Sequence, residues 1–119
     1  KDFEEMLSRG DEVLDISGEL VKSFEHKGKL TNEDIEKLAR VERLAKKIRE
    51  ELGGRDDEDK DDDDGVGMPS LAEAVNTLRV SAGTLYSELK KTTRFTISAT
   101  AIQSTNTVLR LARFLKISR

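Results

Sequence analysis

Apolar residues recur at helical spacing over the first part of the chain. Met6, Val13 and Leu20 form one column seven residues apart, and a second column of leucine and valine lies beside it. An apolar face of this width, with charged residues between its members, predicts one amphipathic helix over 2–26. The helix should end before Gly28, because glycine readily adopts the left-handed conformation that terminates helices.

Three further segments show the same periodicity. The ranges 32–52, 70–91 and 95–117 each carry apolar residues three or four positions apart. Thr31 and Ser70 each precede an acidic residue by three positions, which is the spacing of a capping box. The alternation of phenylalanine, threonine and isoleucine after position 95 also fits a short strand, but a lone strand would have no partner, so helix is favoured. The chain is expected to be all-α, with four helices of similar length.

A strongly acidic run divides these four segments into two pairs. Eight acidic residues lie between Asp56 and Asp64. Like charges at this density repel one another and require water, so the range 53–69 is expected to be a flexible acidic loop outside any core. Each half of the chain then forms a helical hairpin. Packing the hairpins together predicts an antiparallel up-down-up-down four-helix bundle, a single domain over 1–119.

The composition limits the classes of function. The chain has 119 residues, 38% of them charged, a net charge of −3 and no cysteine. This balance argues against a nucleic-acid partner, which usually requires a strongly basic surface. No apolar run approaches the roughly 18 residues of a transmembrane segment. The start at Lys1 without Met and the absence of cysteine favour an exported protein slightly over a cytosolic one; compartment and oligomeric state stay undetermined.

Neither a metal centre nor a catalytic site is predicted. The acidic run matches the calcium-binding EF-hand loop only in part, because the first and twelfth positions would fall on Lys60 and Leu71, which offer no carboxylate. Weak, delocalised binding of divalent cations remains an alternative to a purely solvated loop. His26 is the single histidine, which excludes a two-histidine metal site within one chain. We therefore expect no cofactor and no enzymatic activity.

The ends of the expected bundle suggest one candidate binding site. In the up-down-up-down order, the turns after the first and third helices lie at the same end. That arrangement would bring Lys27, Lys90, Lys91 and Arg94 together as an anion-binding rim beside the N-terminus of the fourth helix. The alternative is that these basic residues only compensate helix dipoles and aid solubility.

The middle of the expected bundle suggests a second candidate site. Ser17, Ala39, Ala82 and Ser104 lie at similar depths along their predicted helices, and together they define a candidate mid-bundle pocket that would suit a small ligand. The alternative is that small residues let the helices pack closely, since protein interiors rarely keep voids.

These observations favour an interaction role over chemistry. The expected core contains few convergent polar groups, which a reaction would require. We expect a non-enzymatic helical-bundle protein that acts as a protein-protein interaction or structural module, with another protein as its partner. The alternative is a small-molecule-binding or sensory bundle that uses the mid-bundle pocket.

Overall fold

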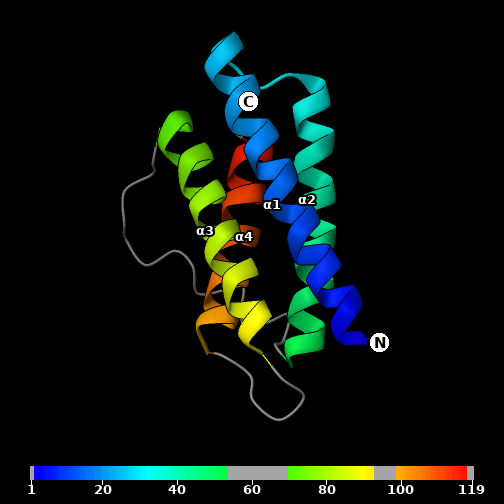
Figure 1. The fold of residues 1–119 in the computed structure, drawn as a ribbon. Helices are drawn as coiled ribbons and strands as arrows, with labels where there is room; N and C mark the ends of the chain where they lie inside the picture. Colours follow the sequence, from blue (N-terminus) through cyan, green and yellow to red (C-terminus); the bar gives the residue numbers. More distant parts are fainter. Residues whose placement is uncertain (1, 54–69, 93–98, 118–119) are drawn as a thin grey trace.

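The computed structural model describes residues 2–53, 70–92 and 99–117. They form four helices: α1 (Asp2–Lys27), α2 (Asn32–Leu52), α3 (Leu71–Lys91) and α4 (Ala99–Ile117). The described residues contain no strand, and the helices pack side by side (Figure 1), so the all-α prediction is confirmed. The bounds of the first three helices differ from the predicted ones by one residue at most. Residues 95–98, expected to begin the fourth helix, lie outside the described part, as do residues 54–69 of the acidic loop.

Residues at the helix ends explain where α1 and α2 stop and where α2 and α3 begin. The Thr31 hydroxyl accepts a hydrogen bond from the backbone N–H of Asp34 at 3.1 Å, and the Asp34 carboxylate accepts one from the Thr31 N–H at 3.0 Å. Ser70 makes the corresponding capping box before α3. Gly28 and Gly53 follow α1 and α2 with φ angles of 70° and 92°, a conformation that glycine adopts without strain.

The helices follow one another around the bundle in the order α1, α2, α4, α3. Both α2 and α3 pack against α1 and α4, so α2 and α3 occupy diagonally opposite corners. Arg9 near the start of α1 pairs with Glu51 near the end of α2. A side chain added at Gly10 would meet Leu89 near the end of α3. Both neighbours of α1 are therefore antiparallel to it, and α2 and α3 end at the same end of the bundle (Figure 1).

The predicted up-down-up-down order is therefore wrong. The helices run up, down, down and up, because α2 ends at one end of the bundle and α3 begins at the other. Bundles with one long crossover connection are a known alternative to the simple up-and-down order. The apolar pattern defines the inner face of each helix but not its neighbours, and a long connection between hairpins permits either order.

The core is made of aliphatic side chains from all four helices. Its members with no measurable exposure, apart from alanines, are Val13, Leu20, Leu38, Val41, Ile48, Leu78, Leu85, Leu89, Val108, Leu109 and Leu115. Each buried side chain of this size stabilises the fold by roughly 1.5 to 3 kcal/mol relative to an exposed one. The helical periodicity of the sequence thus places its apolar residues in one shared core.

A glycine lets α1 approach α3 closely. A Cβ atom added at Gly10 would lie 2.8 Å from Leu89 Cδ1 and 3.4 Å from Tyr86 Cδ1, whereas a Cβ added at Gly18 would meet nothing within 4 Å. A glycine inside a helix costs roughly 0.5 to 1 kcal/mol relative to alanine. The packing against α3 explains this cost at Gly10 but not at Gly18.

The exchanges Gly10→Ala and Gly18→Ala form a matched pair on α1. We expect Gly18→Ala to stabilise the protein by about 0.5 to 1 kcal/mol through better helix propensity. Gly10→Ala should instead destabilise it by about 1 kcal/mol, because the buried Leu89 side chain must shift. Denaturant unfolding of both variants measures the difference. Equal effects would show that α1 and α3 separate freely at this point.

Asp34 links the start of α2 to α1. The residue is 2% exposed, and its Oδ2 atom accepts hydrogen bonds from the Ser23 hydroxyl at 2.8 Å and from the Thr31 backbone N–H at 3.0 Å. Burial alone would raise the pKa of the Asp34 carboxyl. The hydrogen bonds from Thr31 and Ser23 and the charge of Lys37 outweigh burial and hold this pKa below its ordinary value.

The lowered pKa makes the contribution of Asp34 to stability dependent on pH. The contribution is complete above the unfolded-state pKa of about 4, and it is lost as the pH falls through the lower folded-state value. We expect the free energy of unfolding to decrease between about pH 5 and pH 2, and to decrease less in Asp34→Asn than in the parent. Urea unfolding across this range tests the expectation, with the exposed Asp15→Asn as control. Identical pH profiles for parent and Asp34→Asn would contradict it.

Candidate functional site

The structure separates the residues of the predicted anion-binding rim. Lys27 ends α1, whereas Lys90 and Lys91 end α3 at the opposite end of the bundle, about 25 Å away along the axis at the usual helical rise. Arg94 lies outside the described residues. The Lys90 ammonium lies 5.1 Å from the centre of the Tyr86 ring. Lys91 Nζ lies 3.5 Å from Glu88 Oε2 of the same helix. The expected convergence depended on the wrong helix order, and the structure does not bring these lysines together.

The predicted mid-bundle pocket is divided as well. Ser17, Ala39 and Ala82 lie at similar heights, close to an ion pair between α1 and α2, but Ala39 is only partly buried. Ser104 lies about 18 Å away from Ala39 along the axis, because nearby Asn106 is hydrogen-bonded to the last turn of α2. The Ser17 hydroxyl donates to a carbonyl of its own helix at 2.8 Å. The four residues therefore do not line one shared site.

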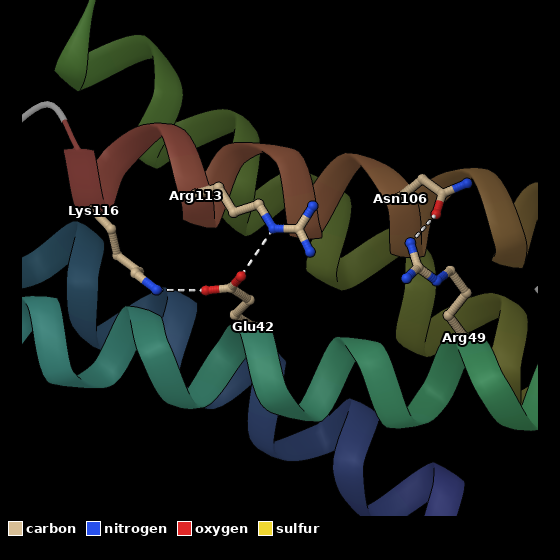
Figure 2. Close-up of polar contacts among 5 residues, drawn as sticks. All are labelled: Glu42, Arg49, Asn106, Arg113 and Lys116. Carbon is tan, nitrogen blue, oxygen red and sulfur yellow. Dashed lines mark hydrogen bonds and ion pairs between the residues drawn. The ribbon is translucent and has the colours of Figure 1, made fainter. Parts of the chain in front are cut away.

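A polar seam joins α2 to α4 (Figure 2). The Glu42 carboxylate accepts hydrogen bonds from Arg113 Nε at 2.8 Å and from Lys116 Nζ at 2.6 Å. Two turns further along α2, Arg49 Nη1 donates to Asn106 Oδ1 at 3.3 Å. Arg49 is only 1% exposed. We call these five residues the α2–α4 polar seam, which places a guanidinium charge inside the bundle.

Electrostatic forces within the seam favour the ionised form of Glu42. Burial alone would raise the pKa of this carboxyl, but the hydrogen bonds and charges of Lys116 and Arg113 outweigh burial and lower the pKa below its ordinary value. The side chain of Glu42 is 15% exposed, against 33% for each cation. Water screens this cluster less than a fully exposed ion pair, so its contribution should exceed the usual range of surface pairs.

Glu42, Arg49 and Asn106 are not among the site residues predicted from the sequence. A usable signal was nevertheless present. Glu42 and Arg49 lie seven residues apart beside the apolar face of α2, and Asn106 and Arg113 lie seven residues apart on α4. When two helices run antiparallel, two polar residues seven positions apart on one helix can pair with two polar residues seven positions apart on the other. This spacing would have indicated the pairing of α2 with α4.

The outer side of α3 has a different chemistry. Four of its exposed residues, Thr77, Val80, Thr84 and Ser87, lie three or four positions apart and carry no charge, and we call them the α3 outer stripe. Val80, near the centre of the stripe, is 61% exposed. Most exposed positions of α1 and α2 are charged, in contrast. The stripe is therefore an uncharged strip on a highly charged molecule.

Only one charged residue lies between Glu73 and Glu88 of α3, and it is outside the stripe. This residue, Arg79, precedes Gly83 by four positions and so shares its column on the helix. A Cβ added at Gly83 would lie 3.9 Å from Leu14 of α1. Arg79 therefore borders α1 and leaves the outward side of α3 uncharged between the two ends of the helix.

The described ranges hold no candidate for two further classes of site. No group of three or more histidine, cysteine or acidic side chains there is placed to hold a metal ion. None of the helices described is long and apolar enough to cross a membrane.

Comparison with known proteins adds no functional information: no family model, no curated protein and no solved structure matches this chain. The fold defines the class, an all-α bundle of four helices whose α2 and α3 lie on opposite corners. A function has to be argued from its surfaces.

The exchange Glu42→Gln tests the α2–α4 polar seam. Removing the carboxylate leaves two cations beside each other, so we expect a loss of about 1 to 2 kcal/mol in the free energy of unfolding, reduced in 1 M salt by screening. Glu50→Gln, at an exposed position of the same helix, is the control and should change stability by less than about 0.5 kcal/mol. Equal losses in the two variants, measured by denaturant unfolding, would show that the seam contributes no more than a surface charge.

Proposed function

We propose that this chain is a non-enzymatic interaction module that binds a helix of another protein along the α3 outer stripe. The observation that carries the proposal is Val80, which is 61% exposed in the middle of an uncharged stripe, although 38% of the chain is charged. The centres of protein interfaces are depleted in charged residues relative to the rest of the surface. Burying this stripe requires the removal of water from hydroxyl and aliphatic groups only.

The spacing of the stripe supports a helix as the partner. Residues 77, 80, 84 and 87 alternate by three and four positions, which is the spacing of a seam between two helices. Small side chains also allow a second backbone to approach closely. The partner helix should present small and aliphatic side chains at the same spacing, because the stripe offers no charge for an ionic side chain to pair with.

The hydroxyl groups of the stripe are compatible with burial. Threonine hydroxyls inside helices of this protein donate to the carbonyl four residues earlier, as Thr105 does to Ala101 at 2.7 Å and Thr107 does to Gln103 at 3.0 Å. Thr77 and Thr84 occupy interior positions of α3, where the same bond is available to them. Docking of a partner would then not require the hydroxyls of Thr77 and Thr84 to stay without a hydrogen bond.

The alternative function, a small-molecule-binding or sensory bundle, has less support. It required hydroxyls from two helices to meet in a mid-bundle pocket. Ser17 and Ser104 lie far apart along the axis, and the Ser17 hydroxyl already donates within α1. The exposed stripe is therefore the better basis for a function.

Site-specific photo-crosslinking identifies the partner and the surface together. A benzophenone amino acid at Thr84 should give a discrete adduct in cells that produce this protein, and the same group at exposed Ser8 of α1 should not. The captured protein, once purified, can be titrated with variants. Val80→Glu should weaken its binding at least tenfold, since it buries a charge without a partner.

A matched variant distinguishes the loss of contact at the α3 outer stripe from a general effect of an added negative charge. Ser8→Glu introduces the same charge on an exposed position of α1 and should change the affinity less than twofold. Both variants should keep the melting temperature of the parent, because both positions face solvent. The proposal is overturned if Val80→Glu binds as tightly as the parent, or if the adduct forms through Ser8 instead of Thr84.

A further inference from the structure

Charges of opposite sign lie at the two ends of the α3 outer stripe. Glu73 lies four positions before Thr77, and Lys91 lies four positions after Ser87; both charged residues are exposed. The alternation of four and three positions within the stripe therefore continues to both charges, so they share its side of the helix. α3 packs against α1 and α4 (Figure 1), and the exposed line from Glu73 to Lys91 lies on the side away from them.

This line is symmetric about its midpoint at position 82. Positions 73 and 91, 77 and 87, and 80 and 84 are each equally distant from the midpoint. A contact between two copies across a two-fold axis requires such symmetry, because residue i then meets residue j and residue j meets residue i. Two antiparallel copies of α3 centred on position 82 form three kinds of pair, each present twice: Glu73 with Lys91, Thr77 with Ser87, and Val80 with Thr84.

The charges select the antiparallel orientation. Glu73 and Lys91 are separated by about 27 Å along the axis in each copy, so both ends of the line meet an opposite charge at the same time. A parallel pair would instead place glutamate against glutamate at one end and lysine against lysine at the other, where like charges repel. The line is therefore complementary in charge to a second, antiparallel copy of itself.

Both end charges can take a further partner. The Lys91 side chain is 70% exposed, and its ammonium lies 3.5 Å from a carboxylate oxygen of Glu88. The Glu73 carboxylate accepts a hydrogen bond from the Ser70 backbone N–H at 3.2 Å. An ammonium has three donors and a carboxylate has about four acceptor sites. Pairing with a second copy is thus compatible with the capping box of α3.

The residues beside the midpoint suit a close approach of two helices. Ser81 and Gly83 flank position 82 in the sequence and lie on either side of the exposed line. Near a two-fold axis, a residue at such a position lies close to its own copy, so a charge there would meet a like charge. Ser81 and Gly83 carry no charge, and glycine lets a second backbone come near.

We propose that two copies of this chain pair through their α3 outer stripes, in antiparallel orientation, when no other protein occupies them. The inference rests on the proposed function, whose surface it shares, and adds its regulation, because a partner helix has to displace the second copy. A single seam between two helices is small for a protein interface, so the pairing is weak, with a Kd between about 1 µM and 1 mM. A partner that offers aliphatic side chains in place of Thr84 and Ser87 displaces it through greater apolar burial.

Charge exchanges test the pairing in the purified protein. Glu73→Lys and Lys91→Glu each place like charges at both ends, so each should raise the Kd by about fivefold or more in sedimentation equilibrium. Lys91→Glu leaves the capping box of α3 intact. An equimolar mixture of the two variants restores opposite charges at both ends and should dimerise at least as tightly as the parent. Arg79→Glu reverses an exposed charge outside the stripe and, as the control, should change the Kd by less than about twofold.

Disulfide formation tests the orientation. The chain has no cysteine, so Val80→Cys and Thr84→Cys each provide a single thiol. The antiparallel pair places these two positions opposite each other, whereas two copies of position 80 are displaced by about 6 Å along the axis in addition to the separation of the helices. A mixture of the two variants should therefore form its mixed disulfide about fivefold faster, or more, than either variant forms a dimer alone.

Three results overturn the proposal. The first is a parent protein that stays monomeric over the whole micromolar to millimolar range. The second is a mixture of the charge variants that dimerises no better than each variant alone, and the third is equally fast disulfide formation by Val80→Cys alone. Each of these results leaves the capture of another protein at Thr84 unaffected, so a failure of the pairing is distinguishable from a failure of the proposed function.

Discussion

The pairing of α2 with α4 through their polar seam is the contact on which the helix order depends. Glu42 needs cationic partners, and α4 supplies both Arg113 and Lys116 on the facing side. In the up-down-up-down order α2 would lie beside α3, whose only basic residue before its last turn is Arg79. Losing the cationic partners of the partly buried Glu42 would cost about 1 to 2 kcal/mol. This cost disfavours the alternative order, although both orders would bury similar apolar faces.

The order of the helices also distributes charge over the surface. α1 binds α2 through ion pairs that include Arg9–Glu51 and Lys37–Glu19, each contributing about 0 to 1 kcal/mol. It binds α3 through close apolar packing at Gly10. The acidic and mixed-charge surfaces thus gather on α1 and α2, the basic surface lies on α4, and the uncharged stripe lies on α3. Three kinds of surface on one small bundle support a role in binding.

The buried polar groups described above have structural roles. Asp34 caps α2 and ties it to α1 through Ser23, and Glu42 joins α2 to α4. Their pKa values are shifted downward by hydrogen-bond donors and cations, whereas a general acid or base acting near neutral pH needs a carboxyl pKa that is raised. Asp34 and Glu42 therefore stabilise the fold in their ionised forms.

The sequence by itself determined the helices, their caps and their inner faces. These features depend on interactions between residues a few positions apart, such as the capping box at Thr31, and on the spacing of apolar side chains along a single helix. Only the tertiary structure decided which helices are neighbours, and with that decision the sites changed. Lys27 and Lys90, predicted to share one end of the bundle, lie at opposite ends. Ser104, predicted to lie level with Ala39, lies at a different height along the axis. The reason is that apolar packing is non-directional, so an amphipathic helix fits either neighbour, and the choice rests on specific polar contacts between α2 and α4.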